Sequence, residues 1–155
     1  MRYKIRVILD NDNDEDVFKD FEVSKNINLT KFHEYIKKEF NLQGCEMASF
    51  YSVDENWDTL IEYTLVPFDD NSVPMEKLSL HEILNNNESS ILYVYDFMNM
   101  WTFYVELIEE AQEINNILYP RIIFSVGNVP EKAPDKKFTN EDIGKEDLDE
   151  DEYLY

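Results

Sequence analysis

The sequence predicts an α+β domain, in which a mixed and mostly antiparallel sheet packs with two helices and an acidic C-terminal tail follows. Three observations support this fold class. Polar and apolar residues alternate in Arg2–Leu9, apolar residues recur at helical spacing from Leu29 to Phe40, and the composition turns acidic from Glu131 onward. Because 155 residues with 43% hydrophobic content can bury one sizeable core, we expect one domain over residues 1–130 and a flexible acidic tail over residues 131–155.

The chain is expected to open with two strands. Alternation places the apolar residues of Arg2–Leu9 on one side, and Val17–Val23 alternates in the same way. The connection Asp10–Asp16 consists almost entirely of Asp, Asn and Glu, which suit an exposed turn. A hairpin is therefore predicted.

A helix should follow the hairpin. Leu29, Phe32, Ile36 and Phe40 fall on one helical face, and Asn28 can cap the first turn. Gly44 is predicted to supply the left-handed residue beyond the helix end.

The middle of the chain predicts two further strands and a second helix. Met47–Val53 and Leu60–Phe68 are rich in aromatic and β-branched residues, which favour strands. Leu80–Leu84 is predicted to form a short helix with Ser79 as its cap.

The centre of the sheet is expected in the next segments. Ile91–Phe97 and Trp101–Ile108 read as strands, and only Met98, Asn99 and Met100 separate them, which indicates a tight hairpin. A further strand is predicted within Ile117–Val126.

Charge narrows the classes of partner. The chain has 14 Lys and Arg against 34 Asp and Glu, a formal net charge of −20. A surface this acidic repels phosphates, so direct nucleic-acid binding is not expected. The single cysteine and the lack of a signal segment or a long apolar run favour a cytoplasmic protein without a membrane span.

Catalytic motifs are not recognisable. With three glycines the chain contains neither the dinucleotide-binding nor the phosphate-binding glycine loop, and its two histidines do not form the zinc-protease motif. We therefore predict no catalytic residue, metal or cofactor, and the sequence favours a noncatalytic role.

Several short motifs together resemble one family. They are Tyr3-Lys4-Ile5-Arg6-Val7, Phe21-Glu22-Val23, Leu29-Thr30 with His33-Glu34, Tyr93-Val94-Tyr95-Asp96-Phe97 with Trp101, and Tyr119-Pro120-Arg121. Over roughly residues 2 to 130 the chain resembles the plasmid pRiA-type ORF-three-like family, also called insertion-element passenger proteins of the TnpR-like kind. The activity of that family is not established, and we take its mobile-element label as a genomic association.

The resemblance implies a β-β-α opening similar to the β-grasp arrangement and a set of candidate binding residues. These are His33, Tyr95, Asp96, Trp101, Tyr119 and Arg121. The chain departs from the family pattern at Met98 and Asn99, where Gly and Asp are usual, and at Phe103, where a histidine is common. The resemblance therefore implies that part of any ligand site has been lost.

Three hypotheses about function follow. The first is a noncatalytic interaction module whose exposed apolar or aromatic face binds an unidentified protein partner, with a basic partner as one option. The second is an acidic decoy that mimics nucleic acid and occupies a basic site, motivated by the charge of −20 and the tail. The third is a small-ligand binder or enzyme that uses His33, Asp96 and Arg121, which requires these three side chains to converge.

Overall fold

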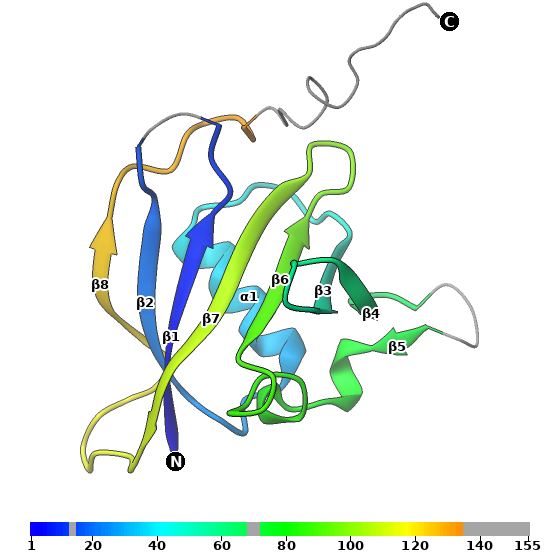
Figure 1. Ribbon diagram of the computed structural model, residues 1–155. Helices are drawn as coiled ribbons and strands as arrows, with labels where there is room; N and C mark the ends of the chain where they lie inside the picture. Colours follow the sequence, from blue (N-terminus) through cyan, green and yellow to red (C-terminus); the bar gives the residue numbers. More distant parts are fainter. Residues whose placement is uncertain (13–14, 68–71, 135–155) are drawn as a thin grey trace, which may run out of the picture.

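One helix lies against one face of a curved eight-stranded sheet in the computed structural model, which describes residues 1–12, 15–67 and 72–134 (Figure 1). The elements follow the chain as β1 (Arg2–Leu9), β2 (Phe18–Ser24), α1 (Leu29–Glu39), β3 (Ala48–Val53), β4 (Thr59–Thr64), β5 (Val73–Pro74), the 3₁₀ turns η1 (Met75–Lys77) and η2 (Leu80–Glu82), β6 (Ser90–Tyr95), β7 (Trp101–Ala111) and β8 (Arg121–Val126). The fold is α+β.

The strands run in the order β5-β4-β3-β6-β7-β1-β2-β8. Every pair is antiparallel except the short β4–β5 pair, which is parallel. The predicted β1–β2 and β6–β7 hairpins are both present, and β1 lies between β2 and β7. The chain therefore opens strand, strand, helix as expected, while the β-grasp likeness stays a prediction.

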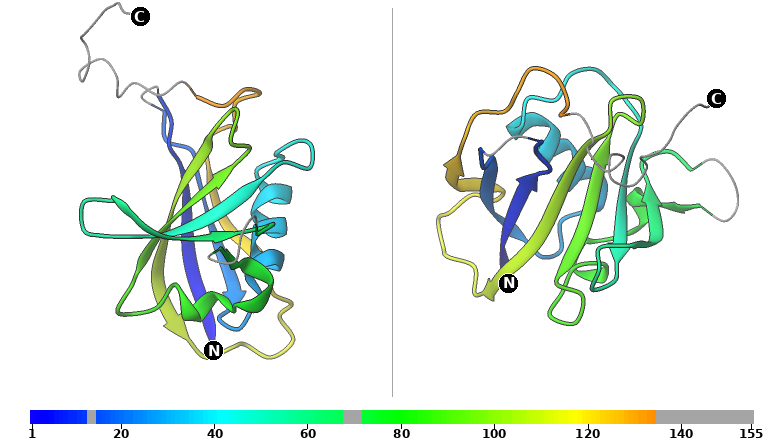
Figure 2. Two further views of the ribbon diagram at one scale, coloured as in Figure 1. Left: turned by 90° about the vertical axis from the view of Figure 1, so that its right-hand side faces the viewer. Right: turned by 45° about the horizontal axis from the view of Figure 1, so that its top comes forward.

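The core lies between α1 and the face of the sheet that it covers, which we call the inner face (Figure 2). Tyr3, Ile5, Val7 and Leu9 alternate inward from β1, as the sequence pattern predicts. On α1 the buried residues are Leu29, Phe32, His33 and Ile36, and the Phe32 ring stacks on Phe50 of β3 with centroids 5.7 Å apart. Burial of these rings supplies the main driving force that holds α1 on the sheet.

The opposite, outer face of the sheet carries no helix within the described residues. The β3–β4 hairpin projects to this side, and its tip residue Trp57 contacts Tyr104 of β7 edge to face, with ring centroids 4.8 Å apart (Figure 2). The side chains that face outward from β1 and β2 are largely charged.

The predicted second helix is wrong. Leu80–Glu82 forms one 3₁₀ turn, so within the described residues α1 is the sole α-helix. Ser79 does cap this turn, through a reciprocal capping box with Glu82. The apolar spacing was misleading because residues three apart also share a side in a 3₁₀ turn, and five residues are too few to stabilise an α-helix.

Several boundaries also differ from expectation. Strand β4 ends at Thr64, before the predicted end at Phe68, and β7 continues to Ala111, beyond the predicted end at Ile108. Helix α1 ends at Glu39, and Asn41 rather than Gly44 is the first left-handed residue beyond it, with φ of 55°. The last strand covers only Arg121–Val126 of the predicted 117–126 segment.

The predicted tail lies mostly outside the described residues, since the structure describes residues 131–134 of it and not 135–155. Within the described part Pro134 is buried and Ala133 packs against the core, as does Val129 just before the tail. No helix among the described residues is long and apolar enough to cross a membrane.

Candidate functional site

His33 and Tyr95, two of the predicted site residues, lie in the core under α1. The His33 side chain is 5% exposed, and its Nδ1 is 2.6 Å from the hydroxyl of Tyr93 on β6. Burial, helped by the charge of Lys37, lowers the pKa of His33 to about 4, and burial raises the pKa of Tyr93 well above its usual value. Both groups are therefore neutral at physiological pH. Their hydrogen bond joins α1 to β6, which is a structural role.

Tyr95 fixes the loop that follows α1. Its hydroxyl is 2.8 Å from the carbonyl oxygens of Gln43 and Gly44 and accepts a bond from the Glu46 N–H at 3.2 Å. The neighbouring Cys45, the one cysteine of the chain, is exposed on this loop. Tyr95 therefore has its hydrogen-bonding capacity used within the protein.

Asp96 and Trp101 lie at the hairpin between β6 and β7. The Asp96 carboxylate accepts bonds from the Met98 and Asn99 N–H groups and from the Asn99 side chain, so it holds the turn. Both residues line a polar cavity of about 930 Å³ that also contacts the end of α1 and residues 129–134. Both oxygens of the Asp96 carboxylate therefore already accept hydrogen bonds within this turn.

Arg121 lies on the outer face, on the opposite side of the sheet from α1. It binds Glu22 with Nη2 2.6 Å from Oε1, and Arg2 Nε binds the other oxygen of Glu22 at 3.0 Å. Burial would raise the pKa of Glu22, but the hydrogen bonds from Arg121 and Arg2 outweigh it and lower that pKa. The remaining arginine, Arg6, pairs with Asp20 on the same face through two bonds of 2.8 and 3.0 Å.

The predicted residues therefore do not form one site. His33 is enclosed between helix and sheet, Asp96 holds a turn at one end of the sheet, and Arg121 is paired on the outer face. The convergence that the third hypothesis requires is not found. Among the described residues no three His, Cys, Asp or Glu side chains gather where they could hold a metal ion.

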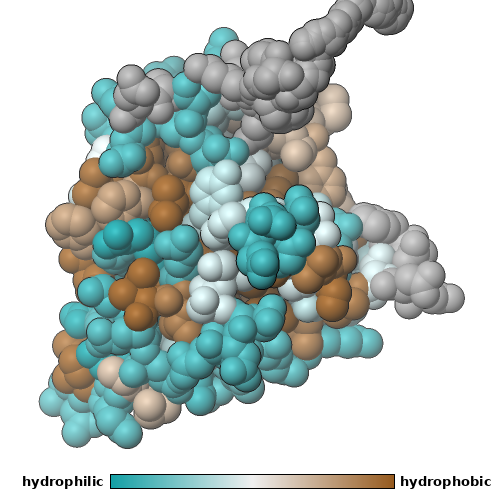
Figure 3. All heavy atoms as spheres, viewed as in Figure 1, coloured by the Kyte–Doolittle hydropathy of each residue, from teal (hydrophilic) through white to brown (hydrophobic). Residues whose placement is uncertain are grey.

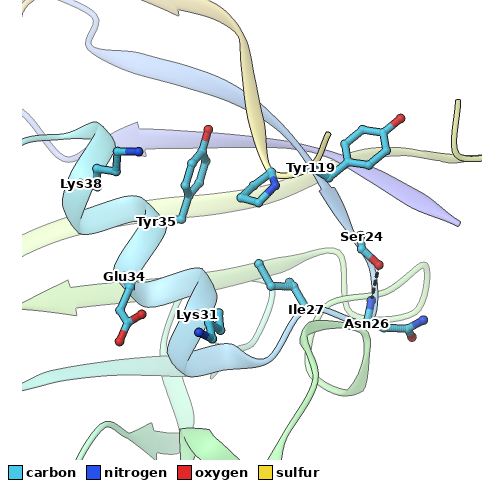
Figure 4. A pocket seen from close by; sticks show the side chains of 9 residues that line it. Ser24, Asn26, Ile27, Lys31, Glu34, Tyr35, Lys38 and Tyr119 are labelled. Atoms are coloured by element: carbon cyan, nitrogen blue, oxygen red, sulfur yellow. Dashed lines mark hydrogen bonds between the residues drawn. The ribbon is translucent and has the colours of Figure 1, made fainter. Parts of the chain in front are cut away.

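Tyr119, the sixth predicted residue, lines a groove beside α1 (Figure 4). The groove has a volume of about 470 Å³ and runs between the exposed side of α1 and the cis Tyr119–Pro120 bond that precedes β8. Nine residues line it, and we call it the α1 groove: Ser24, Asn26, Ile27, Lys31, Glu34, Tyr35, Lys38, Tyr119 and Pro120.

The walls of the α1 groove are mainly apolar. Ile27 and Tyr35 both pack against the core. The Tyr35 ring contacts the Phe21 ring edge to face, with ring centroids 5.1 Å apart. The Tyr119 hydroxyl accepts a bond from the Ile114 N–H at 3.2 Å, which fixes that ring on the opposite wall. Burial and the charge of Glu39 raise the pKa of Tyr35 to about 12, so its hydroxyl is a neutral donor.

Charge at the rim of the α1 groove comes from one side of α1. Lys31, Glu34 and Lys38 are all exposed there, and the structure gives neither lysine an ion-pair partner in the part of the chain that it describes. The local charge is therefore net positive, on a chain whose formal net charge is −20.

Comparison with known proteins gives the family. The plasmid pRiA4b ORF-3-like protein family matches residues 1–135 of the sequence. The chain belongs to this family.

A crystal structure of a protein of unknown function from Methanosarcina mazei Go1 has the same fold as this family member. The TM-score is 0.75, the sequences are 16% identical, and the match covers 86% of this chain and 74% of the other. At this identity the likeness concerns the fold alone. No curated protein matches the sequence.

The Tyr-Pro-Arg motif of this family member spans two environments. Tyr119 and Pro120 form a wall of the α1 groove, whereas Arg121 is bound to Glu22 on the outer face. The sequence analysis found Tyr119 but missed the helix residues opposite it, because Lys31, Glu34 and Lys38 look like an ordinary solvated helix face. A signal was present in Tyr35, an aromatic residue that the helical spacing places beside these charges.

Proposed function

We propose that the chain is a noncatalytic interaction module that binds an extended segment of a partner protein in the α1 groove. The chemistry of the groove is the main support for the proposal. It combines an apolar floor with positive charge at the rim, and nothing in it resembles a nucleophile held by a base.

The open form of the groove favours a protein segment over a small molecule. None of the nine lining residues is buried; each is half-buried or exposed. Small-molecule sites enclose most of the ligand surface, whereas a peptide lies along a groove and inserts alternate side chains.

Exposed apolar surface outside the groove also favours a protein partner. Among the residues that the structure describes, eleven large hydrophobic residues are exposed, and five of them fall in the segment that contains Tyr119: Ile108, Ile114, Leu118, Ile123 and Phe124. Ile123 and Phe124 belong to β8, the last strand in the sheet order, and Figure 3, which views the outer face, shows hydrophobic surface over this edge. Apolar surface gathered in this way is typical of protein contact sites.

The rim charges define the chemistry of the partner segment. Lys31 and Lys38 are seven residues apart on α1, a separation of about 10 Å along the helix axis. A segment that presents acidic side chains to both lysines and apolar side chains to Ile27, Tyr35 and Tyr119 fits the groove best. A basic partner, the option that the net charge suggested, would have to bind elsewhere on the surface.

A peptide-display selection on the full chain tests the proposal. We expect the selected peptides to combine acidic and apolar residues, and to lose at least tenfold in affinity on K31E/K38E in fluorescence anisotropy titrations. The matched control K77E reverses an exposed lysine outside the groove and should bind as the native chain does, provided that all variants show the same thermal unfolding. Selected peptides that bind all three proteins equally would contradict the proposal; a basic protein that binds regardless of the groove variants would favour the decoy hypothesis.

Three further expectations from the sequence analysis remain proposals. They are a cytoplasmic location, an association with mobile elements, and the β-grasp likeness of the β-β-α opening. Each is consistent with a small interaction module, and none depends on the α1 groove.

A further inference from the structure

We infer that the acidic segment 141–155 of the same chain occupies the α1 groove and competes with the partner. This inference rests on the proposed function, because it assigns a regulatory occupant to the same site. It commits to one segment, whose chemistry and reach both match the groove.

The chemistry of segment 141–155 is that of the ligand proposed above. Residues 141–152 contain eight acidic residues and one lysine, and Tyr153, Leu154 and Tyr155 follow directly. Acidic side chains next to large apolar ones are what the two rim lysines and the apolar floor of the α1 groove select. No other stretch of the sequence joins an acidic run of this length to aromatic residues.

Charge directs this segment to α1 rather than to the rest of the surface. The helix carries Lys31, Lys37 and Lys38 against Glu34 and Glu39, so it is net positive. The three arginines are paired with Glu22 and Asp20 on the outer face and offer no free positive charge. Since the chain as a whole is strongly negative, the exposed side of α1 is where an acidic segment meets least repulsion.

The described part of the chain ends close to α1, so the residues that follow it start near the groove. Ala133 packs against the core, and residues 129–134 line one cavity together with Phe40 and Asn41, at the end of α1. From there the groove residues Lys38, Tyr35 and Lys31 lie on successive turns of the same helix, within about 20 Å. The roughly 20 residues between Pro134 and Tyr153 span up to about 66 Å when extended, which is more than enough.

Tethering makes a weak contact effective. A segment joined to its site by a chain of suitable length has an effective concentration of about 1 mM, so a segment that binds with a dissociation constant of about 100 μM as a free peptide would fill the groove about 90% of the time. A competing peptide would then bind the native chain about tenfold more weakly than a chain whose own segment cannot bind.

The test uses the full chain and a fluorescein-labelled peptide with the sequence of residues 141–155, followed by fluorescence anisotropy. The variant Y153S/L154S/Y155S removes the apolar anchor and leaves all described residues unchanged. We expect this variant to bind the peptide about tenfold more tightly than the native chain does. Adding K31E/K38E to the variant should remove the gain, and adding K77E should not.

Each other outcome has a defined meaning. Equal binding to the native chain and to Y153S/L154S/Y155S would overturn the inference while leaving the groove as a peptide site. Lack of binding to every variant would also overturn it, since the segment would then have no affinity for the groove. The proposed function is judged separately, by whether the display-selected peptides bind and respond to K31E/K38E.

Discussion

His33 is held between α1 and β6 with its Nδ1 against the Tyr93 hydroxyl. Burial lowers its pKa from 6.5 to about 4, so the folded protein keeps the ring neutral over a pH range in which the unfolded chain binds a proton. Protonation in that range favours the unfolded state. The stability that neutral His33 contributes is therefore complete above a pH of about 6.5 and is lost as the pH falls toward about 4.

This linkage predicts the behaviour of H33Q, which cannot titrate. As the pH is lowered from about 7 to about 4, the native chain should lose up to about 3 kcal/mol more of its free energy of unfolding than H33Q loses. Urea unfolding at a series of pH values measures both. H81Q is the control, because it retains His33 and should follow the native chain; parallel curves for native and H33Q would contradict the prediction.

The sequence analysis was least accurate in assigning roles to individual site residues. His33, Tyr95 and Asp96 belong to family motifs, but each has its polar atoms bonded within the protein. Motif membership does not separate a residue that holds the fold from one that meets a ligand. Burial and hydrogen-bond partners make that separation, and both depend on contacts between residues distant in sequence.

Among the elements, α1 depends on a cap that also joins it to the 3₁₀ turn η1. The Asn28 Oδ1 accepts a bond from the Thr30 N–H at 2.9 Å, and its Nδ2 donates to the Glu76 carbonyl oxygen at 2.8 Å. The sequence analysis predicted the cap. The second bond could not be predicted, since Glu76 is far along the chain.

The two bonds of Asn28 can be separated by substitution. N28A removes both and should lower the free energy of unfolding by about 2 kcal/mol, whereas N28D keeps the cap acceptor, loses the donor, and should cost about half as much. Urea denaturation provides the values. Asn87→Ala, in an exposed turn, serves as the control; equal costs for N28A and N28D would show that the cap contributes nothing.

Local patterns predicted the longer elements and not their order in the sheet. The alternation in β1 and the helical spacing in α1 reflect which side of each element is buried, so they are visible in the sequence. The pairing of β1 with β7 involves residues about 100 apart, and no local pattern encodes it. Likewise β5 has two residues, too few to show alternation.

At the scale of the whole molecule, charge is unevenly distributed. The outer face holds the arginines in pairs with buried carboxylates, α1 is locally positive, and the remainder of the chain is acidic. Repulsion caused by the excess of acidic over basic residues acts over the long range and is screened by salt, whereas the half-buried pairs are screened much less.

Added salt should therefore stabilise the protein. Between about 10 mM and 100 mM NaCl the Debye length falls from about 30 Å to about 10 Å, and we expect Tm to rise by about 3 °C. Differential scanning calorimetry measures the change, with choline chloride as a control for specific binding of sodium. A fall in Tm would mean that the arginine pairs outweigh the general repulsion.

Cys45 offers a practical route to the partner. It is the one thiol in the chain, it is exposed, and it lies on the loop that Tyr95 anchors next to the end of α1, outside the α1 groove. A single maleimide dye can therefore be attached at a fixed place without engineering the protein. Energy transfer from that dye to a labelled peptide would then report occupancy of the neighbouring groove in solution.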